Sequence, residues 1–278
     1  WDLLLVDDLE HLYDTGAPEP LASTTLAAVR WAIPTIPRPL RRGLPLASVA
    51  AAGWRRLEPP TSRPPAPRQV VLLVCLHLCE SGKGLVALIV LLCFETYMRP
   101  SEALALRRFQ LVAPVPGVAG TLARWSVLVR ASELGVPGKT GEYDASISLD
   151  LPRHQLLVPA LRRLTAELRE NDRVFPFDYP TLLRAWNCSL AALMLSHLRL
   201  SPYCLRHGGA SEDRASASRS LLEVQKRGGW KTFESVRRYE KHARLGLLLH
   251  RVPPALLREA SAKEQELAEL LLSACKTR

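Results

Sequence analysis

The sequence predicts a mostly α protein with a small antiparallel β-sheet, in which a small helical domain precedes a larger one. Apolar residues recur at helical spacing over most of the chain, whereas the segment 125–151 combines β-branched residues with alternation and a Pro-Gly turn. A third observation is PPTSRPPAPR at 59–68, whose five prolines in ten positions fit neither a helix nor a central strand. The chain has 278 residues, of which 47% are hydrophobic, and this is enough to form sizeable cores.

Residues 1–58 are predicted to form the small helical domain. DLLLVDDLEHLYDTG is amphipathic and ends at Gly16, and STTLAAVRWAI begins with Ser23, a residue type that caps helices. The stretch IPTIPRPLRRGLPL is broken by prolines, and LASVAAAGWRRL predicts another short helix. The proline-rich segment 59–68 then predicts an extended linker between the domains.

The larger domain, 69–278, is predicted to begin with helices at 69–81 and 84–97 and a third helix that opens at Pro100. The strands of 125–151 follow. Helical spacing then returns in HQLLVPALRRLTAELREN and PTLLRAWNCSLAALMLSHL and continues to the amphipathic C-terminal segment. One face of that segment indicates packing on its own domain or docking on a neighbouring subunit, and it carries Leu257, Leu267, Leu270 and Leu271.

The charge of the chain favours a polyanionic partner. Lys and Arg number 37 against 27 Asp and Glu, a net charge of +10, which favours nucleic acid ahead of an anionic membrane. The apolar runs at 70–78 and 84–94 are each too short to span a bilayer, so no membrane association is expected. No signal peptide is expected, and a first residue other than Met suggests a fragment or a processed piece.

The six cysteines are expected to be buried free thiols of a protein in a reducing compartment, since no CxxC pair is present. Cys75, His77 and Cys79 form a C-x-H-x-C run that resembles a metal-binding pattern. On a helix, however, residues two apart point to different faces, and this run lies in the apolar segment VVLLVCLHLCE. No metal site is therefore predicted.

The stretch FETYMRPSEALALRR places an arginine where an apolar helix ends. Proline favours the first helical turn, and a glutamate three positions after the cap reaches back to it, so Pro100 and Glu102 put Arg99 at a helix N-terminus. That end offers free N–H groups and the positive pole of the helix dipole. An arginine fork there can contact two phosphate oxygens. The plainer alternative is an arginine whose head reaches solvent.

Two further stretches combine basic and aromatic residues. In SPYCLRHGGASEDRA, Arg206 precedes His207 and a run of small residues that lets backbone or DNA approach closely. In LLEVQKRGGWKTFESVRRYEKHARL, Trp230 precedes a short helix with Tyr239 near its end, among basic residues. A tyrosine among cations would lie close to a bound phosphate backbone, whereas the ordinary alternative is a solvated basic helix.

In that order, MRPSEALAL, PGKTGE, YCLRHGGAS and RGGW followed by RRYEKH resemble the signature of the tyrosine recombinase (phage integrase) family. The match covers about residues 69–245, and the preceding helical piece is similar to the family's core-binding, SAM-like domain. The resemblance implies a tyrosine-recombinase-like catalytic domain that cuts and rejoins DNA, in recombination or in integration of a mobile element. The reaction would pass through a 3′-phosphotyrosyl intermediate, without cofactor, metal ion or ATP.

The resemblance also implies roles for individual residues. Arg99 and Arg206 match the two arginines that clamp the non-bridging oxygens of the scissile phosphate and neutralise their charge. Tyr239 matches the nucleophile, whose attack frees a 5′-hydroxyl and stores the bond energy in a covalent link. Lys139, in the turn GVPGKTGE between two expected strands, matches the lysine that protonates the departing oxygen. Trp230 matches a His or Trp position, and its indole N–H can donate to the phosphate.

One position departs from the family pattern. The first residue of H-x-x-R is Tyr203 rather than histidine. Histidine exchanges a proton near neutral pH, whereas an unperturbed tyrosine titrates near 10. Tyr203 can still hydrogen-bond the phosphate, but proton transfer from Tyr239 is left open. Glu102 and His207 match residues that support the site rather than react.

The preferred hypothesis is a site-specific recombinase that clamps double-stranded DNA between its two domains and assembles as a dimer or tetramer on it. It would be intracellular, in the nucleus or nucleoid where its DNA lies. Two alternatives stay open: a relative that binds DNA without cutting it, which Tyr203 favours, and a type IB topoisomerase. Basic residues expected to contact the DNA backbone, each with solvated surface as its alternative, are Arg30, Arg41, Arg42, Arg107 and Arg108.

Overall fold

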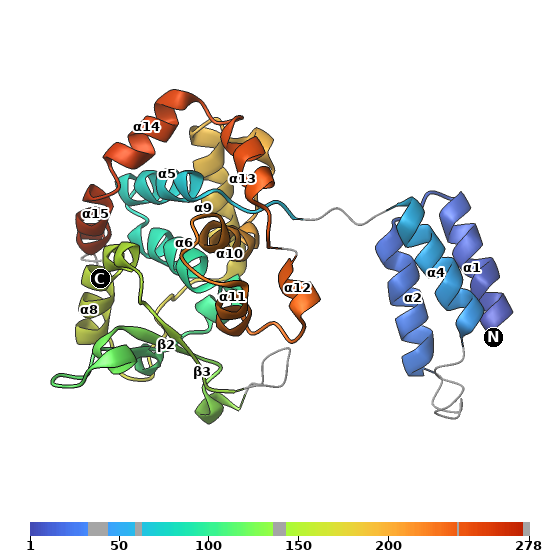
Figure 1. The fold of residues 1–278 in the computed structure, drawn as a ribbon, viewed down its shortest axis with the longest axis horizontal. Coiled ribbons are helices and arrows are strands. Elements are labelled where there is room, and N and C mark those ends of the chain that lie inside the picture. Colours follow the sequence, from blue (N-terminus) through green and yellow to red (C-terminus); the bar gives the residue numbers. More distant parts are fainter. Residues whose placement is uncertain (33–43, 59–62, 136–142, 238, 275–278) are drawn as a thin grey trace. The chain divides into compact units, whose positions relative to one another are not determined.

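The computed structural model describes residues 1–32, 44–58, 63–135, 143–237 and 239–274 (Figure 1). The chain divides into two compact units, Trp1–Ser62 and Arg63–Arg278, each with its own buried core. The predicted fold class is confirmed, because helices dominate the chain and the strands form one three-stranded antiparallel sheet. Within the described ranges, no helix has both the length and the apolar character that crossing a membrane requires.

Three helices of the first unit are described: α1 Asp2–Asp14, α2 Glu19–Ala32 and α4 Pro45–Leu57. Their facing sides bury a small apolar core that includes Trp54 of α4. The carboxylate of Asp2 accepts hydrogen bonds from the backbone amides of Leu46 (3.0 Å) and Ala47 (2.9 Å). The start of α1 therefore satisfies two of the free N–H groups at the start of α4.

The prediction that the second helix starts at Ser23 is wrong, because α2 begins one turn earlier, at Glu19. Pro20 suits a first helical turn, where its missing N–H forfeits no hydrogen bond. Ser23 lies inside the helix, and its hydroxyl donates to the Glu19 carboxylate (3.1 Å). Glu19 also pairs with Arg55 of α4 (2.9 Å), which ties this turn to the neighbouring helix.

Residues 63–67, the last part of the predicted linker, belong to the second unit and pack against its helices. They are extended, as prolines require, but Pro65–Pro67 are buried. The amide of Ala66 donates to the carbonyl of Cys204 (3.1 Å). Arg68 already begins a helix, and the rest of the predicted linker lies outside the described residues. The proline count predicts extension but does not show that this segment is held against the domain.

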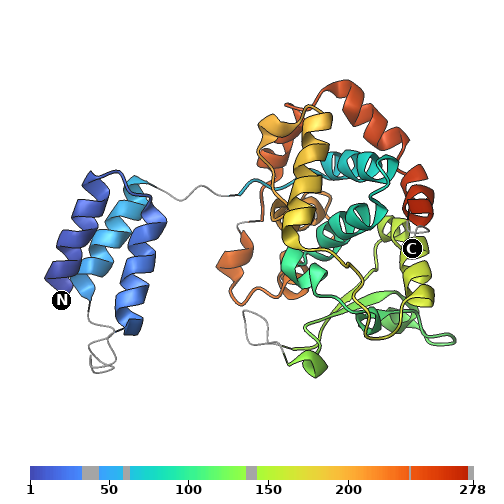
Figure 2. The same ribbon diagram turned by 180° about the vertical axis from the view of Figure 1, so that it is seen from behind.

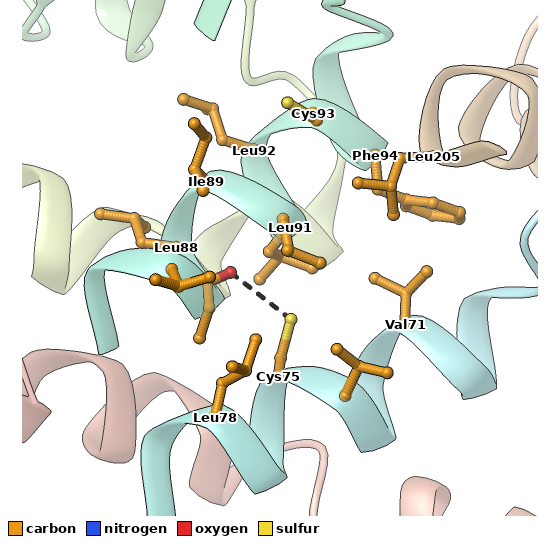
Figure 3. Close-up of a cluster of buried hydrophobic side chains, with 14 of the residues drawn as sticks. Val71, Cys75, Leu78, Leu88, Ile89, Leu91, Leu92, Cys93, Phe94 and Leu205 are labelled. Atoms are coloured by element: carbon orange, nitrogen blue, oxygen red, sulfur yellow. Dashed lines mark hydrogen bonds between the residues drawn. The ribbon is translucent and has the colours of Figure 1, made fainter. Parts of the chain in front are cut away.

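Two apolar helices, α5 Arg68–Glu80 and α6 Gly84–Thr96, form the centre of the second unit's core. Every residue from Val86 to Thr96 is buried, which explains why this stretch carries so little charge. Cys75 of α5 donates its thiol hydrogen to the carbonyl of Ala87 of α6 (3.4 Å), as the dashed line in Figure 3 shows. Burial raises the pKa of this thiol, so Cys75 is a protonated core residue.

The sheet consists of β1 Leu111–Val112, β2 Ser126–Val129 and β3 Ala145–Ser148, in the order β1-β2-β3. All pairs are antiparallel, and Val127 of β2 faces Ile147 of β3. The two strands predicted in 125–151 are thus present. β1 was not predicted, because two residues are too few to show alternation. Lys139 lies between β2 and β3, outside the described residues.

Figures 1 and 2 show the second unit from opposite sides, with the sheet at the bottom in both views. Its other helices are α7 Pro100–Leu104, α8 Val158–Glu167, α9 Tyr179–Ala192, α10 Cys204–Ala215, α11 Leu221–Gly228, α12 Phe233–Arg237, α13 His242–Leu249, α14 Pro254–Ala262 and α15 Glu266–Ala274. Short 3₁₀ turns span Arg108–Gln110, Gly120–Ala123, Ser132–Leu134, Pro152–Leu156 and Ser196–Leu198.

The amphipathic C-terminal segment packs on its own unit. It forms two helices, α14 and α15, and α15 lies against α5, α6 and α8. Leu267 and Leu271 are fully buried there, and a Cβ added at Gly84 of α6 would lie 2.1 Å from the Cβ of Ala274. The structure therefore shows this segment packed on its own unit, the first of the two arrangements that the sequence allows.

Candidate active site

The site begins at α10, whose glycines let it approach α6 closely. A Cβ added at Gly209 would lie 1.9 Å from the carbonyl oxygen of Phe94, and one at Gly208 would lie 2.2 Å from that of Ala66. A side chain at either position would force the backbones apart. The small-residue run thus serves the approach of the chain's own backbone. This approach sets Arg206, on the first turn of α10, against the C-terminal end of α6.

Arg206 is 6% exposed, and backbone carbonyls fix its guanidinium group. Nη1 donates to the carbonyl of Tyr97, and Nη2 donates to that of Gly228 at 2.6 Å. The group also lies over the Trp230 ring, with its Cζ 4.3 Å from the ring centroid. Arginine has five N–H donors, so these two carbonyls leave three donors for a ligand.

Arg99 lies at the N-terminus of α7, as predicted. Pro100 takes the first turn, and the carboxylate of Glu102 accepts from both the amide (2.8 Å) and the Nη1 (2.8 Å) of Arg99. Burial lowers the pKa of the Arg206 guanidinium, and the nearby charge of Arg99 lowers it further. A buried guanidinium beside a partly exposed one favours a bound anion, so the pair is suited to phosphate.

Tyr239 is 7% exposed and lies in a turn just after α12, where its amide donates to the carbonyl of Val236 (2.8 Å). Its ring is 4.3 Å from that of Trp230 and 4.9 Å from that of His207, measured between centroids. The nearby Tyr239 side chain acts on the Arg206 guanidinium in the direction opposite to burial and raises its pKa. The Trp230 ring thus packs against both Tyr239 and the guanidinium that would hold a phosphate.

Trp230 depends on the two glycines before it. Gly229 ends α11 with a φ of +62°, a left-handed conformation that favours glycine. The chain then turns the indole back over Gly228, where an added Cβ would lie 1.9 Å from the ring. The sequence RGGW thus places one ring in contact with both Arg206 and Tyr239.

His207 is held as a neutral ring beside Tyr239. Burial first, and then the charges of Lys241, Arg206 and Arg63, lower the pKa of His207 to about 4. A neutral imidazole can stack on the phenol without adding a further cation to the site. Its role as a supporting residue agrees with this contact but stays a prediction.

This pKa predicts a loss of stability in mild acid. In the unfolded chain a histidine takes up a proton near pH 6.5, whereas folded His207 takes it up only near pH 4. Stability is therefore fully present at neutral pH and falls as the pH drops below about 6.5. We expect His207 to account for about 1 kcal/mol of the loss between pH 7 and pH 5, reduced by the partial exposure of the ring. Urea unfolding of wild type and His207→Gln at both pH values measures it, and equal losses in the two proteins would refute it.

Tyr203 lies directly before α10, where its ring contacts two other side chains. The Tyr179 ring is 6.0 Å away, and the guanidinium Cζ of Arg63 is 4.8 Å from the Tyr203 centroid. Tyr203 is thus a platform for an arginine that sequence analysis did not single out. Nothing in the sequence near Arg63 signals this contact, because the two residues are distant along the chain.

Other predicted DNA-contacting residues bind parts of their own unit. Arg30 donates to the Ser48 hydroxyl (2.7 Å), Arg107 to the carbonyl of Asn171 (2.8 Å), and Arg108 twice to the carbonyl of Thr165 (3.0 Å each). These bonds leave fewer donors for DNA. Contact with DNA by these residues stays a prediction. Lys139, Arg41 and Arg42 lie outside the described residues.

A buried network of charges lies beside the site, and sequence analysis missed it. The carboxylate of Asp213, in α10, has no exposed surface. It accepts hydrogen bonds from the Tyr97 hydroxyl, from Nη2 of Arg153 and from Nε of Arg219 (2.9 Å). Tyr97 has a left-handed backbone with a φ of 56°. Its hydroxyl is held by Asp213 while its carbonyl holds Arg206, so the network reaches the site through this residue.

Glu95, 1% exposed, is the second anion of the network. It accepts from Nε of Arg153 (2.8 Å), and Nε2 of His154 lies 3.2 Å from its carboxylate. Burial alone would raise the pKa of Glu95, but the nearby His154 ring and the charge of Arg153 prevail and lower it to about 2. The one feature of the sequence that indicates this network is the single carboxylate, Glu95, in the otherwise uncharged helix GLVALIVLLCFET.

No protein-family model matches the chain, and the search of curated proteins finds no match. Among solved structures, the chain is similar to the XerH site-specific recombinase bound to palindromic difH substrate, in a post-cleavage complex. The identity is 14%, the match covers 88% of this chain and 72% of that chain, and the TM-score is 0.48. The pre-cleavage complex of XerH bound to difH gives 15% identity, 89% and 71% coverage, and a TM-score of 0.48.

Proposed function

We propose that this protein breaks and rejoins DNA strands as a site-specific recombinase of the tyrosine type. The observation that carries the proposal is the packing of both Arg206 and Tyr239 against the Trp230 ring, each 4.3 Å from its centroid, with Arg206 pinned by two carbonyls. The charge of Arg99 also acts on this guanidinium. A fixed cation pair beside a buried tyrosine is the arrangement that nucleophilic attack on a phosphodiester requires.

In the proposed reaction, the Tyr239 phenol loses its proton to water, its oxygen attacks the phosphorus and a 3′-phosphotyrosyl bond forms. The bond from phosphorus to the 5′-oxygen breaks, and that oxygen leaves as a hydroxyl after taking up a proton. Arg99 and Arg206 neutralise the charge that spreads over the non-bridging oxygens, so the step needs neither a metal ion nor ATP. The Trp230 indole donates to the phosphate, and Lys139 protonates the leaving oxygen. Attack by the 5′-hydroxyl of another strand then restores the phosphodiester and frees Tyr239.

The substrate of the proposed enzyme is double-stranded DNA. The net charge of +10 favours binding to its phosphates, so affinity should fall steeply with salt. The first unit would bind DNA together with the second and clamp the duplex, and copies of the chain would assemble as a dimer or tetramer on it. The reaction would take place inside the cell, in the compartment that holds the DNA, and it would serve recombination or integration.

A covalent-trapping assay tests the proposal. Purified protein is mixed with a randomised pool of nicked duplexes, from which cleavage releases a short 5′-hydroxyl fragment that cannot rejoin. We expect a protein–DNA adduct on denaturing gels, and its complete loss in Tyr239→Phe, because phenylalanine keeps the ring but lacks the attacking oxygen. Sequencing of the trapped DNA then reports the preferred site.

Tyr203 favours one other function, that of a related protein that binds DNA without cutting it. If wild type gives no adduct but Tyr203→His does, position 203 limits proton transfer. Salt-sensitive DNA binding without an adduct in either protein would reject the cutting enzyme and support the binding protein. Relaxation of supercoiled DNA without a preferred site would instead support a type IB topoisomerase.

A further inference from the structure

The segment 63–67 brings an arginine to the edge of the candidate site. Pro65–Pro67 are buried, and the amide of Ala66 donates to the carbonyl of Cys204 in the first turn of α10 (3.1 Å). A Cβ at Gly208 would collide with the carbonyl of Ala66, so segment and helix fit closely. Arg63, at the start of this segment, is therefore held beside α10 although its own side chain is exposed.

Two contacts fix where Arg63 lies. Its guanidinium stacks on the Tyr203 ring, with its Cζ 4.8 Å from the centroid. Its carbonyl accepts a hydrogen bond from Nζ of Lys241, two residues after Tyr239 (3.3 Å). Among the described residues, no carboxylate forms an ion pair with Arg63. Stacking leaves the edge of the guanidinium, which carries the N–H donors, free to bind a ligand.

His207 stacks beside Tyr239, with the ring centroids 4.9 Å apart. After burial, the charges of Lys241, Arg206 and Arg63 lower the pKa of this ring. Arg206 is already committed to the phosphate beside Tyr239 in the proposed function. Tyr203 lies three residues before Arg206, one helical turn away. Arg63 and Lys241 thus form a second group of positive charge next to the first.

We propose that Arg63, stacked on Tyr203, binds together with Lys241 a second phosphate of the duplex, adjacent to the phosphate held by Arg99 and Arg206. The inference rests on the proposed function for its substrate, DNA. It gives Tyr203 a role that does not involve proton transfer, namely to position Arg63. It also makes the segment that enters the second unit part of the DNA-binding surface.

Equilibrium binding to a short duplex of random sequence tests this inference, with every variant made in the Tyr239→Phe background so that cleavage does not contribute. We expect Arg63→Ala to weaken binding about 5- to 10-fold and to reduce the slope of log affinity against log salt by about 0.9, as loss of one phosphate contact does. Arg258→Ala is the matched control, because it removes an exposed arginine on α14. It should change affinity by less than about twofold.

Substitutions at Tyr203 test whether its ring positions Arg63 for binding DNA. Tyr203→Ala should weaken binding as Arg63→Ala does, Tyr203→Phe should restore it because the ring remains, and the double alanine variant should bind no worse than Arg63→Ala alone. Unchanged affinity and salt slope in Arg63→Ala would overturn the inference, as would full additivity of the two alanine variants. If wild type forms the adduct but Arg63→Ala does not change DNA affinity, this inference is rejected and the cutting reaction stands. If Arg63→Ala weakens DNA binding but wild type forms no adduct, the cutting reaction is rejected and this inference stands.

Discussion

Replacing Arg206 by lysine is expected to slow formation of the covalent adduct at least about 1000-fold, the scale on which single donors to a transition state act. The guanidinium uses two donors on the carbonyls of Tyr97 and Gly228 and stacks on Trp230, so its remaining donors have a fixed direction. An ammonium group cannot bond both carbonyls and also present a planar fork to phosphate. Single-turnover rates on the trapped substrate measure the effect. Binding of the same DNA should weaken less than tenfold, because only one phosphate contact changes.

Arg227 offers a matched control for this variant. It is buried to a similar degree, and its guanidinium donates to the carbonyls of Ser148 (2.8 Å) and Glu95 (2.7 Å) while lying 5.4 Å from the Tyr97 ring. Arg227→Lys should lower the unfolding temperature as Arg206→Lys does but slow the reaction less than about tenfold. If both variants lose activity equally at a temperature where both are folded, the loss comes from packing and Arg206 has no special role.

The parts of the site that sequence analysis predicted are those fixed by neighbours along the chain. Arg99 is capped by Glu102 three residues on, and Trp230 is turned by the two glycines directly before it. Helix capping and left-handed turns act over three or four residues, so the pattern shows in the sequence. The start of α2 was misplaced by one turn because two residues there, Glu19 and Ser23, can each begin a helix.

The parts that were missed depend on residues far apart in the chain. Arg153 meets Glu95 across 58 positions and Asp213 across 60, and no periodicity links them. The same holds for Arg63 and Tyr203, which meet because the extended segment packs along α10. A single sequence shows that these side chains are charged or aromatic, but burial and pairing arise only when the fold is formed.

The largest loss of stability is expected when the central carboxylate of the buried network is removed. Asp213→Ala leaves Arg153 and Arg219 without one of their anions and leaves the Tyr97 hydroxyl without its acceptor, all in a site with little access to water. Breaking a buried charge pair on one side costs about 3–5 kcal/mol, because the remaining charge stays buried and uncompensated. Urea unfolding at neutral pH measures this difference in the free energy of unfolding.

An exposed pair supplies the control. Glu167→Ala breaks the Arg163–Glu167 contact on the outer side of α8 (2.7 Å), where both partners are partly solvated, and should cost less than about 1 kcal/mol. The loss of stability in Asp213→Asn should lie between those of the two alanine variants, because an amide can still accept from the Tyr97 hydroxyl but carries no charge.

Tyr97 also holds Arg206 through its carbonyl, so partial loss of this network should reach the site. Adduct formation by Asp213→Asn should therefore fall even where the protein is fully folded. Normal activity in that variant would show that the backbone of Tyr97 keeps its left-handed conformation without the network, and that the charges serve stability alone.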